Sequence, residues 1–182
     1  MQLFLYEVLR RLQAPAGSTV LLSHSGRTDL QRSIRIKANA RHFCSQMIVV
    51  HDLDAHPDCR ELEQQILSIA QNATCRMTVR VVCSELESWF LGDLDAVAKA
   101  YNIRLEPLKA NQAKLRDPDR LINAAEEFAR LLKSAGKSFR KTDAASRIGA
   151  EIDLTPGRNR SRSFNSMLKT LCDVVRDAGG ME

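Results

Sequence analysis

The sequence predicts an α/β fold with a mostly parallel sheet, helices on both faces of that sheet, and a helical extension at the C-terminus. Residues 47–50 form a short apolar run rich in β-branched side chains, which is typical of a buried parallel strand. Residues 76–83 alternate and then become apolar, which predicts a second strand. Amphipathic helical patterns separate the predicted strands, and this alternation indicates parallel strands joined by right-handed crossovers.

The remaining elements follow from apolar spacing and from turn residues. In chain order we predict a helix over 2–12, a strand over 19–22, and helices over 30–41, 60–71, 94–101, 119–133, 142–150 and 164–177. Ser84, Thr142 and Ser163 are expected to cap helices, as is Asp58. We predict an α/β core over residues 1–103 and a basic helical extension packed on it over residues 104–182.

Composition limits the classes of protein to consider. The chain has 182 residues, of which 44% are hydrophobic, and this is enough for a packed core. We find neither a long apolar run nor a signal-peptide pattern, so we expect a cytoplasmic protein without a membrane partner. The five cysteines are odd in number and widely spaced, and we expect reduced thiols without a disulfide framework or a zinc motif.

The net charge of +5 is unevenly distributed. Residues 1–103 carry 11 basic and 11 acidic side chains, whereas residues 104–182 carry 16 and 11. A basic segment attached to an acidic centre suits a polyanionic substrate. The alternative is an ordinary solvated helical surface.

Two acidic clusters each follow a predicted strand. Asp52 and Asp54 come after the first strand, and Glu85 and Glu87 come after the second. Parallel strands present their carboxyl ends at one edge of a sheet, where ligands bind, and carboxylates there can hold Mg²⁺. Each cluster also has a plain structural reading, either as a solvated loop or as acidic residues in the first turn of a helix.

Four segments carry a family resemblance: HDLDAHPDC, ELESWFLGD, KSFRKTDAASRIGAEID and SRSFNSMLKTL. Together they resemble a bacterial domain-of-unknown-function family with a Toprim-like, Rossmann-like fold that is related to overcoming-lysogenization-defect nucleases. The resemblance covers most of the chain. It implies Mg²⁺-bound carboxylates that break or transfer phosphodiester bonds, and an ATPase partner encoded nearby.

The chain departs from this family at its start. The family has a first strand ending in a Glu-Gly turn, followed by a helix similar to MQLFLYEVLRRL, and that strand and its glutamate are absent here. Glu7 lies within the helix pattern and is a poor substitute. We therefore expect the reading frame to begin roughly 10 to 15 residues upstream, the length of one strand and a turn. We also expect a groove beside one of three strands, next to Asp52 and Asp54.

The predicted metal centre uses one or two Mg²⁺ (or Mn²⁺) ions, which polarise the phosphodiester and activate a bound water. Its ligands would be Asp52, Asp54, Glu85 and Glu87. The residues expected to be catalytic are Asp52, Asp54, Glu85 and Lys141.

Basic residues of the extension are candidates for contacts with nucleic acid. Lys141 and Arg140 match a basic position of the family and would offset charge on the reacting phosphate. Arg158, Arg160 and Arg162 could bind phosphates through bidentate contacts. Alternatively, all five are exposed loop residues that bind nothing.

These features predict a nuclease-like protein that hydrolyses phosphodiester bonds in an ATPase-linked defence or DNA-processing system. Neither Tyr6 nor Tyr101 lies beside an acidic cluster, so hydrolysis is favoured over strand transfer. Trp89 and Phe90 are expected in the core. The alternative function is a non-enzymatic, degenerate Toprim-like partner or regulator of an ATPase.

Overall fold

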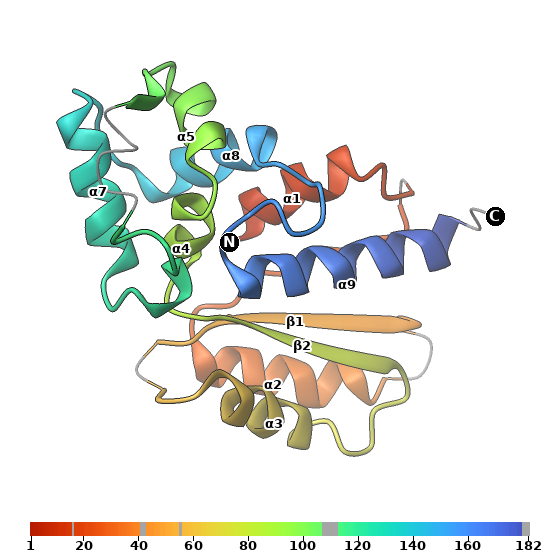
Figure 1. Ribbon diagram of the computed structural model, residues 1–182. Coiled ribbons are helices and arrows are strands. Elements are labelled where there is room, and N and C mark those ends of the chain that lie inside the picture. The colour runs from red at the N-terminus through yellow and green to blue at the C-terminus, as the bar shows by residue number, and fades with distance from the viewer. Residues whose placement is uncertain (16, 41–42, 55, 107–112, 180–182) are drawn as a thin grey trace. The chain divides into compact units, whose positions relative to one another are not determined.

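Two units make up the chain in the computed structural model, which describes residues 1–15, 17–40, 43–54, 56–106 and 113–179 (Figure 1). The sheet unit is Leu22–Cys83. The helical unit combines Met1–Leu21 with Ser84–Glu182. The chain is therefore of the α/β class, but its strands and most of its helices belong to different units.

The sheet unit contains two parallel strands, β1 (Gln46–Asp52) and β2 (Arg76–Val82). Their register pairs Val49 with Val79 and Asp52 with Val82, so both strands end at the same edge. Two helices, α2 (Arg27–Ala38) and α3 (Cys59–Ser68), lie on one face of this small sheet (Figure 1).

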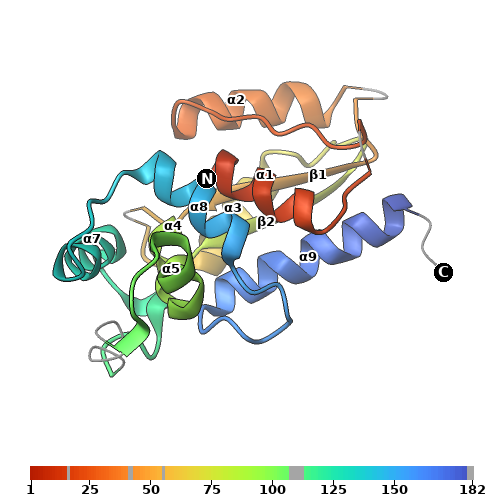
Figure 2. The same ribbon diagram turned by 90° about the horizontal axis from the view of Figure 1, so that it is seen from above.

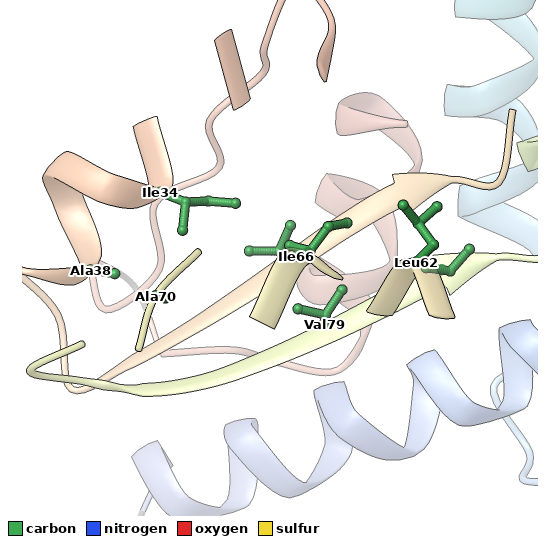
Figure 3. Close-up of a cluster of buried hydrophobic side chains, with 8 residues drawn as sticks. Ile34, Ala38, Leu62, Ile66, Ala70 and Val79 are labelled. Carbon is green, nitrogen blue, oxygen red and sulfur yellow. The ribbon is translucent and has the colours of Figure 1, made fainter. Parts of the chain in front are cut away.

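A compact apolar core joins the two helices of the sheet unit to its two strands (Figure 3). Side chains from α2 and α3 meet valines that project from the same face of β1 and β2. The buried members of this core are Ile34, Ala38, Val49, Leu62, Ile66, Ala70, Val79 and Val81. The amphipathic patterns of α2 and α3 therefore correspond to buried faces, because each helix packs its apolar stripe against the valines.

The helical unit is built from helices that come from both ends of the chain (Figures 1 and 2). They are α1 (Gln2–Arg11), α4 (Leu86–Leu91), α5 (Leu94–Tyr101), the 3₁₀ helix η1 (Pro118–Arg120), α7 (Ala124–Ser134), α8 (Lys141–Glu151) and α9 (Arg162–Gly179). None of the helices in the described part of the chain combines the length and apolarity needed to cross a membrane.

Aromatic side chains form the centre of the helical unit. Phe4, Trp89 and Phe164 contact one another, with ring centroids 5.5 to 6.2 Å apart, and Phe90 continues the cluster towards Phe128. All five side chains are almost fully buried. The prediction that Trp89 and Phe90 belong to the core is confirmed.

The prediction of a third strand is wrong. Residues 19–22 form no strand, Val20 is 74% exposed, and the described residues contain a two-stranded sheet. Both helices of the sheet unit lie on one face of this sheet. Helices on both faces, and a groove next to Asp52 and Asp54, stay predictions. Arg41, the predicted end of the helix over 30–41, lies outside the described residues.

The two units follow a different division from the predicted core over 1–103 and extension over 104–182. The N-terminal α1 packs on α8, where a Cβ on Gly149 would lie 3.0 Å from Phe4 O. Arg11 strengthens this contact, because its Nη1 donates to Gly149 O (3.1 Å) and to Ile152 O (2.6 Å). The close approach of α1 to α8 explains why the first helix joins the C-terminal part.

The prediction that all cysteines are unpaired is also wrong. Cys59 and Cys83, which are 24 residues apart, are joined by a disulfide with their Cα atoms 6.1 Å apart. Folding brings the first residue of α3 next to the residue after β2. Sequence spacing alone did not reveal this proximity.

Candidate functional site

The first acidic cluster occupies the loop that leaves β1. Asp52 is the last residue of β1 and is half-buried, whereas Asp54 is exposed and has a positive φ of 50°. Between them, Leu53 N donates to Val82 O (3.0 Å), which extends the pairing of β1 with β2 by one step. The sheet therefore holds the start of this loop, and Asp54 lies just beyond the last strand contact.

The far end of the same loop is held by the start of α3. The Asp58 carboxylate accepts hydrogen bonds from Arg60 N (2.7 Å) and Glu61 N (2.9 Å), so it caps the helix as predicted. These backbone donors hold the pKa of Asp58 below its ordinary value. We refer to the described residues of this loop, 53–54 and 56–58, as the acidic loop.

Glu85 belongs to the helical unit and makes a contact that the sequence did not predict. It is the N-cap residue of α4, and its carboxylate accepts a hydrogen bond from Ala125 N (2.9 Å) in the first turn of α7. Ser84, the predicted cap, instead has a φ of 89° and donates its hydroxyl to Leu121 O (2.5 Å). The prediction that Ser84 caps a helix is wrong.

Glu87 lies in the first turn of α4 and is only 3% exposed. Burial raises the pKa of Glu87, and the nearby Glu85 carboxylate raises this pKa further, while the Lys141 ammonium lowers it. Lys141 is the first residue of α8 and is itself exposed. The structure thus brings three of the predicted site residues into one electrostatic neighbourhood. We refer to Glu85, Glu87 and Lys141 as the Glu-Lys cluster.

The four predicted metal ligands are divided between the two units. Asp52 and Asp54 belong to the sheet unit, and Glu85 and Glu87 belong to the helical unit. Among the residues that the structure describes, no three His, Cys, Asp or Glu side chains are grouped so that they could hold a metal ion. A metal site shared by both clusters therefore stays a prediction.

The predicted basic residues other than Lys141 occupy three places in the helical unit. Arg158 and Arg160 line a cavity of about 690 Å³ together with Arg11 and Lys99. Arg140 lines a different cavity of about 530 Å³. A third position is taken by Arg162, which donates to Asp117 Oδ2 (3.1 Å).

Carboxylates also line the larger cavity, but several already have partners. Asp93 Oδ1 accepts from Ala96 N (3.0 Å), and its Oδ2 accepts from Asp153 N (2.8 Å). Asp153 in turn lies 3.6 Å from Arg158 Nε. Sequence reasoning missed Lys99 and Arg11 as lining residues, because neither is near the basic segment in the sequence.

A buried polar network holds the segment that carries these arginines. Asn159 is 2% exposed, and its Nδ2 donates to Trp89 O (2.9 Å) while its Oδ1 accepts from Ser161 N (2.8 Å). Trp89 Nε1 donates to Ser163 Oγ (2.8 Å), and Asp119 accepts from the Ser161 and Ser163 hydroxyls (2.6 and 3.0 Å). The segment between α8 and α9 is therefore fastened to α4 and η1.

Two further predicted caps are wrong in detail. Ser161 Oγ, and not Ser163 Oγ, accepts from Phe164 N (3.0 Å) at the start of α9. Helix α8 begins at Lys141, with Arg140 in the capping position, so Thr142 lies within the helix. The error at α9 arises because the neighbouring Ser161 and Ser163 have equal capping propensity, whereas no side chain in the described part of the chain caps α8.

Comparison with known proteins identifies a family for this chain. No curated protein and no solved structure matches it significantly. A family model does match, over residues 1–172, and that family is described as Domain of unknown function (DUF4276). The match spans nearly the whole sequence, so the chain belongs to the DUF4276 family.

Proposed function

We propose that this chain is a Toprim-like protein that hydrolyses phosphodiester bonds of nucleic acid with Mg²⁺ or Mn²⁺. The observation that carries the proposal is the Glu-Lys cluster, in which a buried carboxylate, a second carboxylate and an ammonium gather at the start of α4. Perturbed carboxylates beside a cation are a feature of catalytic sites. An ATPase encoded nearby, as the family resemblance implies, would place this activity in defence or DNA processing.

The proposed chemistry uses the acidic clusters as metal ligands. Asp52 and Asp54 in the sheet unit and Glu85 and Glu87 in the helical unit are the candidate ligands, since a few carboxylates with several waters suit Mg²⁺. The metal would polarise the phosphodiester and lower the pKa of a bound water. Lys141 would balance the charge that develops on the phosphate.

The arginine-lined cavity supports a polyanionic substrate. Lys99, Arg158 and Arg160 are exposed side chains around one cavity, and Asn159 fixes the backbone between the two arginines. Cations at a phosphate backbone release counterions, which provides affinity without sequence readout. We propose that these residues bind the nucleic-acid backbone. Arg140 and Arg162, which do not line this cavity, would make further contacts with phosphates.

One observation favours the second candidate function, a non-enzymatic partner or regulator of an ATPase. Glu85 already uses an oxygen to accept the hydrogen bond from Ala125 N, which is a structural duty at the start of α7. In that case the acidic residues would cap helices and the basic residues alone would bind nucleic acid. The two candidates differ in whether the protein cleaves DNA.

A plasmid-nicking assay with Mg²⁺ or Mn²⁺ separates these functions. Wild-type protein should nick supercoiled plasmid, EDTA should stop the reaction, and Asp54→Asn should slow it by about two orders of magnitude, since a metal ligand is lost. Glu61→Gln is the matched control, because Glu61 is an exposed acidic residue of the same unit. Absence of nicking by pure wild-type protein that still binds the plasmid would overturn the enzymatic proposal in favour of the second one.

A further inference from the structure

We infer that Cys59 and Cys83 form a reversible disulfide that fastens the acidic loop to the end of β2. The two residues are bonded, and their Cα separation of 6.1 Å lies within the range that disulfides span. Both are half-buried. Small thiol reagents can therefore reach them.

The position of the cross-link suggests what it does. At its start, the acidic loop is tied to β2 by the hydrogen bond from Leu53 N to Val82 O (3.0 Å). At its end, Cys59 is bonded to Cys83, the residue that follows Val82. The two ends of the acidic loop are therefore linked to two consecutive residues, Val82 and Cys83, at the end of β2. Reduction would keep the hydrogen bond of Leu53 and release Cys59 at the other end of the loop.

Cys59 is the more reactive partner by its place in the fold. It is the first residue of α3, directly after the cap Asp58. The dipole of a helix favours a thiolate at its N-terminus. The carboxylates of Asp58 and Glu61 oppose this effect, and Asp58 already pairs the N–H groups of Arg60 and Glu61.

Cys44 and Cys172 lie in environments that disfavour the thiolate. Burial, and next a hydrogen bond with the neighbouring Cys75, raise the pKa of Cys44 to about 11. Burial likewise raises the pKa of Cys172 in α9. Thiolates are the species that attack disulfides, so Cys44 and Cys172 should take part in exchange only slowly at neutral pH.

The cross-link would form by exchange with a low-molecular-weight disulfide such as oxidised glutathione. The Cys59 thiolate attacks one sulfur of the reagent, which forms a mixed disulfide and releases one thiolate. The Cys83 thiolate then attacks Cys59 Sγ and releases the second thiolate. Two protein thiols lose two protons and two electrons, and one disulfide reagent becomes two thiols.

The cross-link would also hold Asp54 in place for the metal, and this role alone rests on the proposed function. The cross-link itself does not depend on that function. Its test therefore uses readouts that need no metal and no substrate.

The test places the full chain in glutathione buffers of increasing oxidised fraction. Free thiols are alkylated, and the cross-linked peptide is identified by mass spectrometry. We expect one Cys59–Cys83 cross-link that dithiothreitol reverses, while Cys44, Cys75 and Cys172 stay available to alkylation. Hydrogen exchange at the amides of the acidic loop should slow on the order of tenfold in the oxidised protein.

Two variants complete the test. Cys83→Ser should abolish both the cross-link and the difference in exchange, whereas Cys172→Ser, the matched control, should keep both. Pairing of Cys59 with a different cysteine, or no cross-link at any glutathione ratio, would overturn the inference. A cross-link that leaves exchange of the acidic loop unchanged would overturn its fastening role. If Cys83→Ser fails to fold, the comparison of oxidised with reduced wild-type protein still tests the inference.

Discussion

The carboxylate of Glu87 is the most unusual side chain of the candidate site. It is 3% exposed on a short helix whose other residues, from Leu86 to Leu91, are also buried. Burial in a low-dielectric surrounding disfavours the charged form, and the Lys141 ammonium partly offsets this. The protonation state of Glu87 therefore depends on a residue more than fifty positions away in the sequence.

Removing Lys141 should raise the pKa of Glu87 further. In Lys141→Met, a ¹³C NMR titration of the Glu87 carboxyl carbon should show a higher midpoint than in wild type, because an attractive cation is lost. Lys137→Met is the control, since Lys137 is an exposed loop residue outside the Glu-Lys cluster. An unchanged Glu87 midpoint in Lys141→Met would contradict the proximity on which this cluster rests.

The same shift has a consequence for stability. The folded protein holds a proton on Glu87 at pH values where the unfolded chain, with an ordinary pKa of 4.5, has released it. The free energy of unfolding should therefore fall as the pH rises above 4.5, until Glu87 ionises in the folded state as well. In Glu87→Gln, urea denaturation should show a smaller fall in the free energy of unfolding as the pH rises.

At the scale of the elements, the end of α4 depends on one glycine. Gly92 follows α4, and a Cβ there would overlap Asn159 Oδ1 and lie 3.0 Å from Ser161 N. Arg160 N also donates to Gly92 O (3.0 Å). The backbone at Gly92 thus lies directly against the segment that precedes α9.

Gly92→Ala should destabilise the helical unit by roughly 1–3 kcal/mol, the usual cost of overpacking. In an Asn159→Ala background the same substitution should cost less, because the principal clash is gone, and a double-mutant cycle in urea measures this coupling. Asn159→Ala alone also loses its hydrogen bond to Trp89 O. Equal costs in the two backgrounds would show that the close approach does not exist.

Local signals predicted the helices well where a cap and an apolar stripe agree. Helix α5 was predicted to the residue, because the Asp93 cap and the left-handed Asn102 (φ 48°) mark its two ends. Asp58 at α3 was also predicted correctly. Where two hydroxyl residues compete, as at Ser161 and Ser163, propensity alone cannot choose, and contacts with Asp119 and Asn159 decide.

Strand prediction failed at residues 19–22, where a strand would require a partner strand. Residues 19–22 include two β-branched side chains, Thr19 and Val20, but a strand also needs a neighbour to accept its hydrogen bonds. The Leu21 carbonyl instead accepts a hydrogen bond from the Gln2 side chain (3.1 Å). The Cys59–Cys83 disulfide was missed for a similar reason, because it arises from tertiary proximity.

At the scale of the whole molecule, the sheet unit is a continuous segment between two parts of the helical unit. Each unit has its own buried core: the valine-centred cluster of the sheet unit and the aromatic cluster around Phe4 and Trp89. The sequence predicted that Glu85, Glu87 and Lys141 lie near one another, but it could not predict this division, which follows from the close packing of α1 on α8.

Core substitutions should therefore act on one unit at a time. Ile66→Ala should destabilise the sheet unit by roughly 2–5 kcal/mol, because it leaves a cavity in the apolar core. The single tryptophan, Trp89, reports on the helical unit. In Ile66→Ala, the free energy of unfolding obtained from Trp89 fluorescence should therefore fall less than that obtained from amide exchange in β2. Leu132→Ala, in the core of the helical unit, should shift the Trp89 transition instead. Identical shifts for both variants with both probes would show a single cooperative unit.

The proposed function requires that the acidic residues bind a divalent cation. Mn²⁺ binding, followed by electron paramagnetic resonance, measures this in wild type, Asp54→Asn, Glu85→Gln and the double variant. Glutamine at position 85 keeps an oxygen that can accept from Ala125 N, so the fold is preserved. We expect wild type to bind Mn²⁺ tightly and the double variant to lose this binding, because carboxylate ligands are removed. Unchanged Mn²⁺ binding in the double variant would contradict the proposed metal chemistry.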